Sequence, residues 1–184
     1  MDAISYLLDF AFNALLMILI VRVWLQVVKA DFYNPLSQFV VKVSNPLVIP
    51  LRRFIPGLGG IDLATVLLAY IVATGKFFTI AIISGQAAEI PTVLYFYLGL
   101  LVLLKQVGVL FFVMMMVMAV MSWVMQGYNP TQAVLQQLTE PLLRPIRQII
   151  PNMGGLDLSF IAAFLLLNVI NILLSSNLPY WGVV

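Results

Sequence analysis

The sequence contains no cysteine and no histidine, and only 9% of its 184 residues are charged. Without cysteine the chain cannot form disulfides, thiolate nucleophiles or iron–sulfur ligand sets, and without histidine it lacks the imidazole of proton relays and of the usual zinc sites. The P-loop, the GxGxxG fingerprint and the nucleophile elbow are also missing. We therefore expect no enzyme, no cofactor and no metal site.

The basic residues are few and scattered. Nine Lys and Arg against seven Asp and Glu leave a formal charge of +2, without any basic tract. Such a charge distribution does not predict direct nucleic-acid binding.

Apolar side chains dominate the composition, at 63% of the residues, and the mean hydropathy is +1.10. These values lie far outside the range of soluble globular proteins and predict an integral membrane protein. The first apolar run begins after Asp2 and continues without a cleavage site, so we expect it to remain in the mature protein.

Four apolar runs are long enough to cross a hydrocarbon core of ~30 Å, which takes about 20 helical residues. The third run, residues 93–125, would form a helix of about 50 Å, so a tilt, a protruding end or a break near Gly99 or Gly108 remain open. The expected fold class is an all-α membrane protein with about four transmembrane helices. Their expected limits are residues 4–28, 63–84, 97–125 and 158–177.

Basic residues are concentrated in the two longer connections, whereas the turn between the second and third spans and both termini have none. The positive-inside bias then places both connections in the cytoplasm and both termini outside. The basic residues of the connections are Lys29, Lys42, Arg52, Arg53, Arg144 and Arg147, with Arg22 near the inner end of the first span.

The two connections resemble each other. Residues 33–63 and 128–158 align without a gap at an offset of 95 and share 13 identities in 31 positions, most of them Pro, Gly, Asn, Arg, Asp or Leu. We expect a tandem repeat whose copies have the same orientation, because each copy contains two crossings. The first repeat is residues 1–92 with a connection at 30–61, and the second is residues 93–184 with a connection at 128–156.

Each connection should contain an amphipathic helix in the membrane interface, capped by Asn34 or Asn129 before a proline. Pro46 and Pro141 should restart the chain, and a second proline four residues later should kink or end the segment. Glycines should then form a tight turn with positive φ, and an aspartate should cap the next span or, alternatively, bind an ion. These elbow residues are Gly59, Gly60 and Asp62 in the first copy and Gly154, Gly155 and Asp157 in the second.

The elbow arginines are candidates for binding, because guanidinium groups at a membrane boundary grip lipid phosphates or partner carboxylates. The alternative is that they only anchor the topology of the chain. The candidate lipid- or partner-binding residues are Arg52, Arg53, Arg144 and Arg147.

Polar residues inside the spans are a second candidate site, because charge within a bilayer is costly. Asp9 can pair with Lys76 or Lys105, each lysine can instead snorkel outward, or the group can line an ion pathway. All of these residues should lie in the outer half of the bilayer. The expected polar cluster comprises Asp9, Asn13, Lys76, Lys105, Asn168 and Asn171.

The stretch "NPLVIPLRRFIPGLGGIDL" and its copy between apolar spans resemble the YggT family, also called YlmG-like, of small integral membrane proteins. The second copy departs from the pattern, with Arg144 replacing Ile49, Gln148 replacing Arg53 and Asn152 replacing Gly57. The resemblance covers essentially the whole chain and implies a multi-pass protein of a bacterial inner membrane without established enzyme activity. The roles that the resemblance implies are diverse. Members of the family are linked to osmotic stress or ion homeostasis, cell division, nucleoid organisation and plastid cytochrome assembly.

Two functions follow as expectations. The first is a non-catalytic scaffold or assembly factor whose connections dock membrane lipids or membrane-protein partners. The second is a component of an ion or osmolyte transport system that uses Asp9, Lys76 and Lys105. A homo-oligomer is compatible with both.

Overall fold

The computed structural model describes residues 3–124, 129–150 and 158–184, and the regular structure within these ranges consists of helices. Two of the helices contain internal prolines, and the other four are apolar nearly throughout. In chain order the helices are α1 (Ala3–Val27), α2 (Pro35–Arg52), α3 (Leu63–Ile83), α4 (Thr92–Val124), α5 (Pro130–Ile149) and α6 (Ser159–Asn177).

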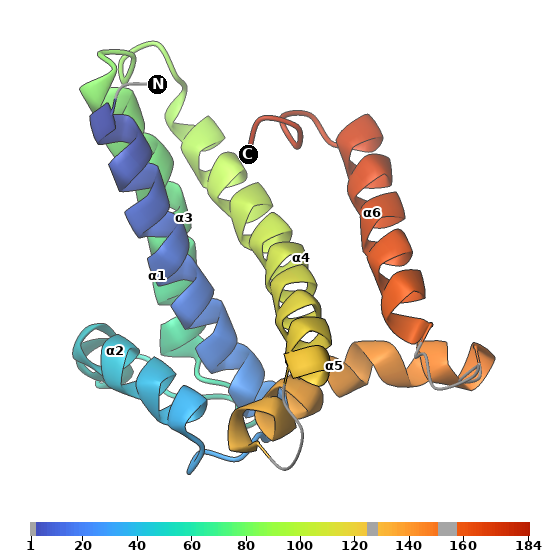
Figure 1. The fold of residues 1–184 in the computed structure, drawn as a ribbon. Coiled ribbons are helices and arrows are strands. Elements are labelled where there is room, and N and C mark those ends of the chain that lie inside the picture. The colour runs from blue at the N-terminus through green and yellow to red at the C-terminus, as the bar shows by residue number, and fades with distance from the viewer. Residues whose placement is uncertain (1–2, 125–128, 151–157) are drawn as a thin grey trace.

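Four of these helices, α1, α3, α4 and α6, are long and apolar enough to cross a membrane. Figure 1 shows them running between two ends of the molecule, while α2 and α5 lie across one end. The all-helical fold and the four candidate spans agree with the sequence-based expectation.

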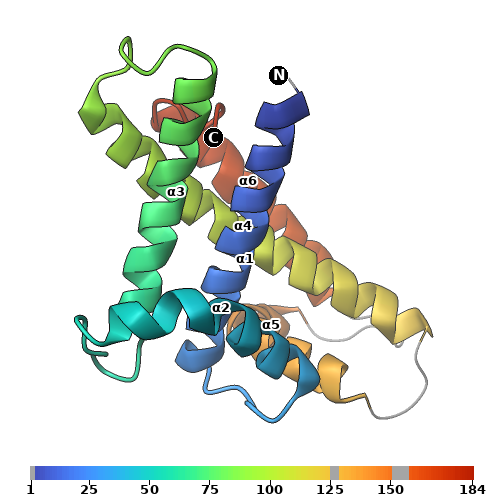
Figure 2. The same cartoon turned by 90° about the vertical axis from the view of Figure 1, so that its left-hand side faces the viewer.

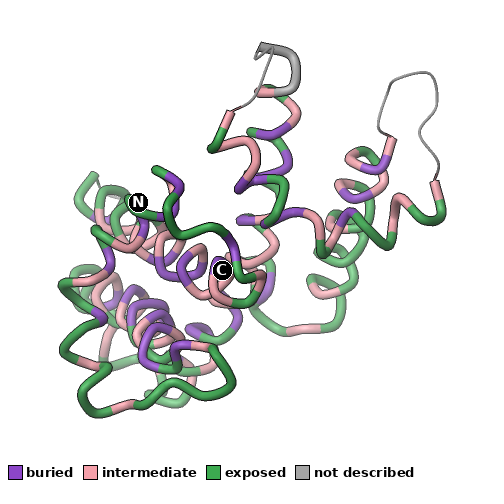
Figure 3. The backbone as a smooth tube through the Cα atoms, turned by 90° about the horizontal axis from the view of Figure 1, so that it is seen from below, coloured by how far each residue is buried: buried purple, intermediate pink, exposed green. Residues whose placement is uncertain are grey.

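The spans do not pack equally. Helices α1, α3 and α4 form a bundle, whereas α6 stands apart and contacts mainly α5 and the lower part of α4 (Figures 1 and 2). In the most apolar stretch of each helix, 33% of α4 but only 11% of α6 is buried. Figure 3 shows the buried residues on the helix faces that meet, with exposed residues on the outside.

Small and branched apolar side chains fill the interior of the bundle. Leu16 and Leu19 of α1 pack against Ala69 and Ala73 of α3, and all four are buried. At the end near α2 and α5, a second cluster includes buried residues of α1, α2, α4 and α5. The amphipathic helices are therefore part of the core and not only appended to it.

Helix α4 is one continuous helix of 33 residues, which corresponds to about 50 Å. Neither Gly99 nor Gly108 interrupts it. Its excess length is accommodated by inclination, because α4 crosses the bundle obliquely relative to α1 and α3 (Figure 2).

The expectation that Pro46 and Pro141 restart the chain is wrong. Helix α2 continues through Pro46 and Pro50, and α5 continues through Pro141 and Pro145. All four prolines are exposed, and each pair is separated by about one helical turn. The carbonyl groups that lose an N–H partner therefore lie on an accessible face, where solvent can satisfy them.

The turn between α2 and α3 has the predicted glycine geometry. Gly59 and Gly60 have φ of 61° and 86°, and the backbones of Leu58 and Ile61 form a bridge across them. Residues other than glycine rarely adopt this left-handed backbone conformation. The Gly-Gly pair therefore allows the chain to turn sharply, and α3 begins soon after the turn.

Helix α2 and the start of α5 lie side by side. Asn34 and Asn129 cap the two helices as predicted, since their side chains accept hydrogen bonds from Leu36 N at 2.9 Å and from Thr131 N at 2.8 Å. Asn34 also donates through Nδ2 to the carbonyl of Pro130. The first connection is thereby joined directly to the second.

Candidate functional site

Asp62 is the centre of a buried ionic cluster at the elbow between α2 and α3. Its carboxylate lies 2.6 Å from Arg52 Nη2 and accepts hydrogen bonds from Arg52 Nε at 2.7 Å and from Thr65 Oγ1 at 2.6 Å. Gln26 Oε1 accepts the backbone N–H of Asp62 at 3.0 Å. The cluster therefore links the end of α1, the end of α2 and the start of α3.

Asp62 occupies the predicted N-cap position at the start of α3, but the side-chain hydrogen bond that usually accompanies an N-cap aspartate is not formed. The reason is competition, because Oδ2 accepts charge-assisted bonds from Arg52, which are stronger than a bond from a neutral backbone N–H. The second-copy elbow residues Gly154, Gly155 and Asp157 lie outside the described residues.

A second arginine, Arg22 of α1, reaches the same carboxylate. Arg22 is only 3% exposed, and its Nε lies 3.9 Å from Asp62 Oδ2. It also donates through Nη1 to Asn45 Oδ1 at 2.9 Å and to the hydroxyl of Ser44. A buried guanidinium thus ties α1 to α2, and Asp62 provides its counter-charge.

Burial alone would raise the pKa of Asp62, because it disfavours the charged carboxylate. The hydrogen bonds from Arg52 and Thr65 and the charge of Arg52 outweigh burial, so the net pKa of Asp62 is below its ordinary value. Asp62 is accordingly ionised at neutral pH.

The four predicted binding arginines differ in their surroundings. Arg53 and Arg144 are exposed. Arg52 is 44% exposed but is held by Asp62, and Arg147 forms a 2.8 Å ion pair with Glu140. Arg53 and Arg144 are therefore the exposed members of this set for which the described residues provide no ion-pair partner.

Three of the predicted intramembrane polar residues meet between α1 and α3. Lys76 Nζ lies 2.7 Å from Asp9 Oδ1 and donates to Asn13 Oδ1 at 3.0 Å, while Asn13 Nδ2 donates to Asp9 Oδ2 at 2.8 Å. Lys76 is buried and Asp9 is partly exposed. This arrangement satisfies the charges of both residues within the bundle.

Lys105 lies elsewhere and does not join Asp9. Its ammonium donates to the carbonyl of Trp181, at 3.1 Å, and to a backbone oxygen of Val184, the last residue of the sequence. Trp181 is buried, and its indole N–H donates to Asn171 Oδ1 at 2.9 Å. Lys105, Asn171 and Trp181 line a cavity of about 540 Å³ between α4 and α6, and Asn168 lines it too. The expected single polar cluster is thus divided into two.

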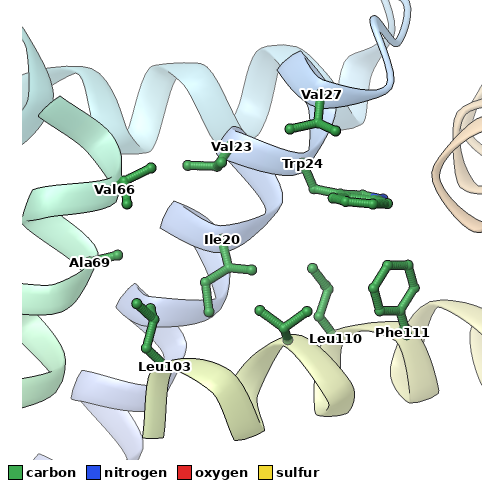
Figure 4. A pocket seen from close by; sticks show the side chains of 10 residues that line it. Ile20, Val23, Trp24, Val27, Val66, Ala69, Leu103, Leu110 and Phe111 are labelled. Carbon is green, nitrogen blue, oxygen red and sulfur yellow. The ribbon is translucent and has the colours of Figure 1, made fainter. Parts of the chain in front are cut away.

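The described part of the chain contains a wholly apolar cavity of about 280 Å³ between α1, α3 and α4. Figure 4 shows Ile20, Trp24, Leu103 and Phe111 around it. The rings of Trp24 and Phe111 make an edge-to-face contact at 5.0 Å. With no polar lining atom to orient a ligand, this cavity fits hydrocarbon and offers no chemistry.

Sequence reasoning did not assign a role to Arg22, Gln26, Thr65 or Trp181. A signal for Arg22 was present, because it is the arginine placed inside the first apolar run. Intramembrane charge requires a partner, and Asp62 is the acidic residue at the start of the next span. Gln26, Thr65 and Trp181 carry no comparable signal, since such residues are common near span ends.

Four apolar spans and two amphipathic helices that cover one end define the class of the protein: a small, multi-pass, all-helical membrane protein. The described residues contain no group of three or more acidic side chains placed to hold a metal ion.

The family model described as CCB3/YggT matches residues 1–83 and 97–178. The chain is 47% identical over 171 residues to the uncharacterized protein YggT of Escherichia coli K12, covering 93% of this chain and 88% of the relative. It is 44% identical over 182 residues to an uncharacterized protein encoded in the proC 3' region of Vibrio alginolyticus, covering 98% of both. No solved structure matches. The chain belongs to the CCB3/YggT family.

Proposed function

We propose that the protein is a non-catalytic membrane scaffold that docks lipids and a membrane-protein partner on a platform formed by α2 and α5. The observation that carries this proposal is that α2 and α5 lie across the same end of the bundle and meet at their N-terminal ends, where Asn34 donates to the carbonyl of Pro130 (Figure 1). Two helices that lie across the spans form a broader surface than either forms alone.

The residue pattern of α2 supports a position in the membrane interface. Ser37, Val40, Ser44 and Val48 are buried against the rest of the protein. A neighbouring stripe of apolar side chains remains exposed, including Phe39 at 57% and Leu47 at 43%. Exposed apolar groups on an amphipathic helix are stabilised by insertion at the headgroup boundary.

The charges support a docking role for the same surface. Arg53 follows α2 and Arg144 lies on α5, and both are exposed. Exposed guanidinium groups bind phosphate or carboxylate oxygens through two parallel hydrogen bonds. We also propose that the platform faces the cytoplasm of a bacterial cell, because it contains most of the basic residues.

The tandem repeat is part of the same proposal. The order of span, amphipathic helix and span occurs twice, and the family model matches one segment in each half. Two copies in the same orientation would place both amphipathic helices at one membrane face, as a shared platform requires.

The proposal is tested by photo-crosslinking in native membranes. A photoreactive residue at Leu47, on the exposed stripe of α2, should capture a discrete partner that mass spectrometry can identify. The matched probe is Leu166 on the exposed side of α6, which should capture lipid or a different set of proteins. Identical capture from both positions would contradict a specific platform.

A double substitution separates docking from folding. Arg53→Gln with Arg144→Gln should reduce capture at Leu47 while leaving membrane insertion and helix content unchanged. Arg53→Lys with Arg144→Lys keeps the positive charges but removes the paired N–H donors of the guanidinium groups, so intermediate capture is expected. Unchanged capture by the glutamine pair would contradict a role for these arginines.

A transport component is the second candidate, because Asp9, Asn13 and Lys76 form a charged group within the spans. It predicts ion or proton flux in proteoliposomes that contain this protein alone, and loss of that flux in Lys76→Met. A purified protein without flux would argue against this candidate.

A further inference from the structure

A polar cleft lies at the elbow between α2 and α3, beside the ionic cluster of Asp62. Its volume is about 520 Å³, within the range of about 300–1,000 Å³ typical of small-molecule pockets. Two isoleucines line part of it. The other residues that line this elbow cleft are Gln26 at the end of α1, Arg52 at the end of α2, and Gly57, Gly60 and Asp62 of the elbow.

The charges beside the elbow cleft do not balance. Arg22 and Arg52 share one carboxylate, that of Asp62, and no other acidic side chain of the described residues lies within ion-pair distance of either arginine. Two guanidinium groups against one carboxylate leave one positive charge in excess. The next residue in the chain, Arg53, is exposed and adds a further positive charge at the edge of the cleft. An excess charge on partly buried groups favours the binding of a counter-ion.

The hydrogen-bonding groups of the cleft are unbalanced in the same sense. Arg52 contacts Asp62 through Nε and Nη2, and no described residue accepts a hydrogen bond from its Nη1. Gln26 accepts the N–H of Asp62 through Oε1, which leaves its Nε2 without an acceptor among the described residues. The backbone N–H groups of Gly57 and Gly60 likewise have no described acceptor. Unused donors together with an excess positive charge are complementary to an anion with several oxygen acceptors.

The position of the elbow favours a lipid as the source of that anion. Helix α1 ends at Val27 and α3 begins at Leu63, so the cleft lies where two spans leave the hydrocarbon core. Two large apolar side chains of the same elbow are exposed, Phe54 at 85% and Leu58 at 72%. Insertion of these side chains between lipids would stabilise them and would place the adjacent cleft at the level of the lipid phosphates.

We propose that the elbow cleft binds the phosphate group of an anionic membrane lipid. Arg52 Nη1 and Gln26 Nε2 donate to the phosphate oxygens, and the N–H groups of Gly57 and Gly60 lie beside them. The excess positive charge favours a headgroup with a net negative charge over a zwitterionic one. The inference rests on the proposed function in placing this end of the bundle in a headgroup layer, and it adds the class of lipid and the residues that hold it.

Gln26→Glu is the informative substitution, because it supplies the missing negative charge and keeps a structural contact. A glutamate can still accept the backbone N–H of Asp62, but it replaces the Nε2 donor by an acceptor. The matched control is Gln38→Glu, the same change on the exposed surface of α2. Gln38 precedes Arg52 on this helix by about 21 Å, which exceeds the Debye length of about 10 Å at 0.1 M salt.

The measurement is lipid co-purification. The full chain is incubated with detergent micelles that contain phosphatidylglycerol and phosphatidylcholine in equal amounts, and the lipids that remain on the re-isolated protein are quantified by mass spectrometry. The expected ratio is about fivefold in favour of phosphatidylglycerol, which corresponds to the ~1 kcal/mol typical of one basic residue near anionic lipid. Gln26→Glu should lower the ratio toward equal binding, and Gln38→Glu should leave it at the parent value. Arg52→Gln should lower it as well, through loss of a donor and a charge.

Four results would overturn the proposal. They are equal binding of both lipids by the parent protein, a preference that persists in Gln26→Glu with unchanged helical content, an equal loss in Gln38→Glu, and displacement of the lipid by inorganic phosphate. The phosphate is compared with sodium chloride at equal ionic strength, and displacement would assign the cleft to a soluble anion.

The lipid test and the test of the platform fail separately. Capture of a partner by the photoreactive residue at Leu47 does not involve Gln26. Loss of lipid preference with intact capture would therefore contradict the elbow site alone, and loss of capture with intact lipid preference would contradict the platform alone.

Discussion

The carboxylate of Asp62 offsets the positive charges of two arginines, Arg22 and Arg52, which lie on different helices. The three side chains differ in their exposure to solvent. Arg22 and Asp62 are 3% and 6% exposed, whereas Arg52 is 44% exposed. The contribution of Arg52 is therefore screened by solvent, and the larger consequence of losing Asp62 is an uncompensated buried charge on Arg22.

We predict that Asp62→Asn lowers the free energy of unfolding by about 2–3 kcal/mol. Arg22→Met in the Asp62→Asn background should recover part of this loss, because the unpaired guanidinium is then removed. A double-mutant cycle measured by thermal unfolding in detergent checks the coupling. Additive effects of the two substitutions would show that Arg22 and Asp62 do not interact.

The pH dependence follows from the lowered pKa of Asp62. Its folded-state pKa lies below the unfolded value of 3.8, so its ionic contribution is complete above about pH 5 and is lost as the pH falls through the folded-state pKa. The difference in melting temperature between the parent protein and Asp62→Asn should be constant from neutral pH down to about pH 5 and should shrink in stronger acid. A difference that grows in acid would contradict the assigned direction.

We predict that the 2.7 Å ion pair between Asp9 and Lys76 stabilises the folded protein. Asp9→Asn should destabilise the protein by about 1–3 kcal/mol, because Lys76 is buried and would retain only its hydrogen bond to Asn13. Exchanging the charges by Asp9→Lys with Lys76→Asp should restore part of the loss, measured by thermal unfolding. Lys105→Asp in an Asp9→Lys background should give no such recovery, since Lys105 lies in the other cluster.

These residues show what a linear sequence can and cannot predict. The cost of intramembrane charge marked Asp9 and Lys76 as one possible pair, beside outward snorkelling of the lysine and an ion pathway. The same principle left Lys105 as an equal alternative, and only the packing of α4 between α3 and α6 separates the two lysines. Capping by Asp62 was expected from its position, but competition from Arg52 depends on the fold of the elbow.

At the scale of elements, the crossing of α3 and α4 depends on Gly99. A Cβ at this position would lie 2.3 Å from Thr74 Oγ1 and 3.0 Å from the backbone N and Cα of Thr74, so both the Thr74 side chain and the α3 backbone would have to shift. At Gly108 of the same helix, a Cβ would meet nothing within 4 Å.

The two glycines form a matched pair of tests. Gly99→Ala should destabilise the protein by about 1–3 kcal/mol through overpacking, although alanine is the better helix former. Gly108→Ala should be neutral or stabilising by up to ~1 kcal/mol through helix propensity. Thermal unfolding in one detergent measures both. Equal effects at the two positions would argue against close packing at Gly99.

The elements themselves were predictable to different degrees. Long apolar runs and Asn-Pro caps are local signals, and they located the spans and the starts of α2 and α5. A proline is also a local signal, but its effect on a helix depends on whether solvent can reach the carbonyl that loses its N–H partner. The exposure of Pro46 and Pro50 is a tertiary property, and for this reason the predicted break in α2 was wrong.

At the scale of the whole molecule, the halves differ in how tightly their spans pack. Helices α1 and α3 are in extensive contact, whereas α4 and α6 diverge and enclose a cleft of about 540 Å³. The Trp181 segment bridges them through Lys105 and Asn171. Similar hydropathy in the four spans could not reveal this difference, because span composition does not specify which helices are neighbours.

We expect α6 to move more than α3. The chain has no cysteine, so spin labels can be attached at introduced cysteine pairs, one joining Phe10 of α1 with Ile82 of α3 and one joining Leu104 of α4 with Ile172 of α6. The second pair should give the broader distance distribution, and Trp181→Phe should broaden it further by removing the hydrogen bond to Asn171. Equally narrow distributions for both pairs would show that α6 is fixed.

The contact of α1 with α5 has a consequence for biosynthesis. The indole N–H of Trp24 donates to the carbonyl of Leu138 at 2.8 Å, across a separation of 114 residues. At a translation rate of about 5–20 residues per second, the acceptor is synthesised about 6–23 seconds after the donor. During this interval α1 is already made while its polar partner does not yet exist. The contact between α1 and α5 therefore closes late in synthesis, and the fold of the first half is completed only by the second.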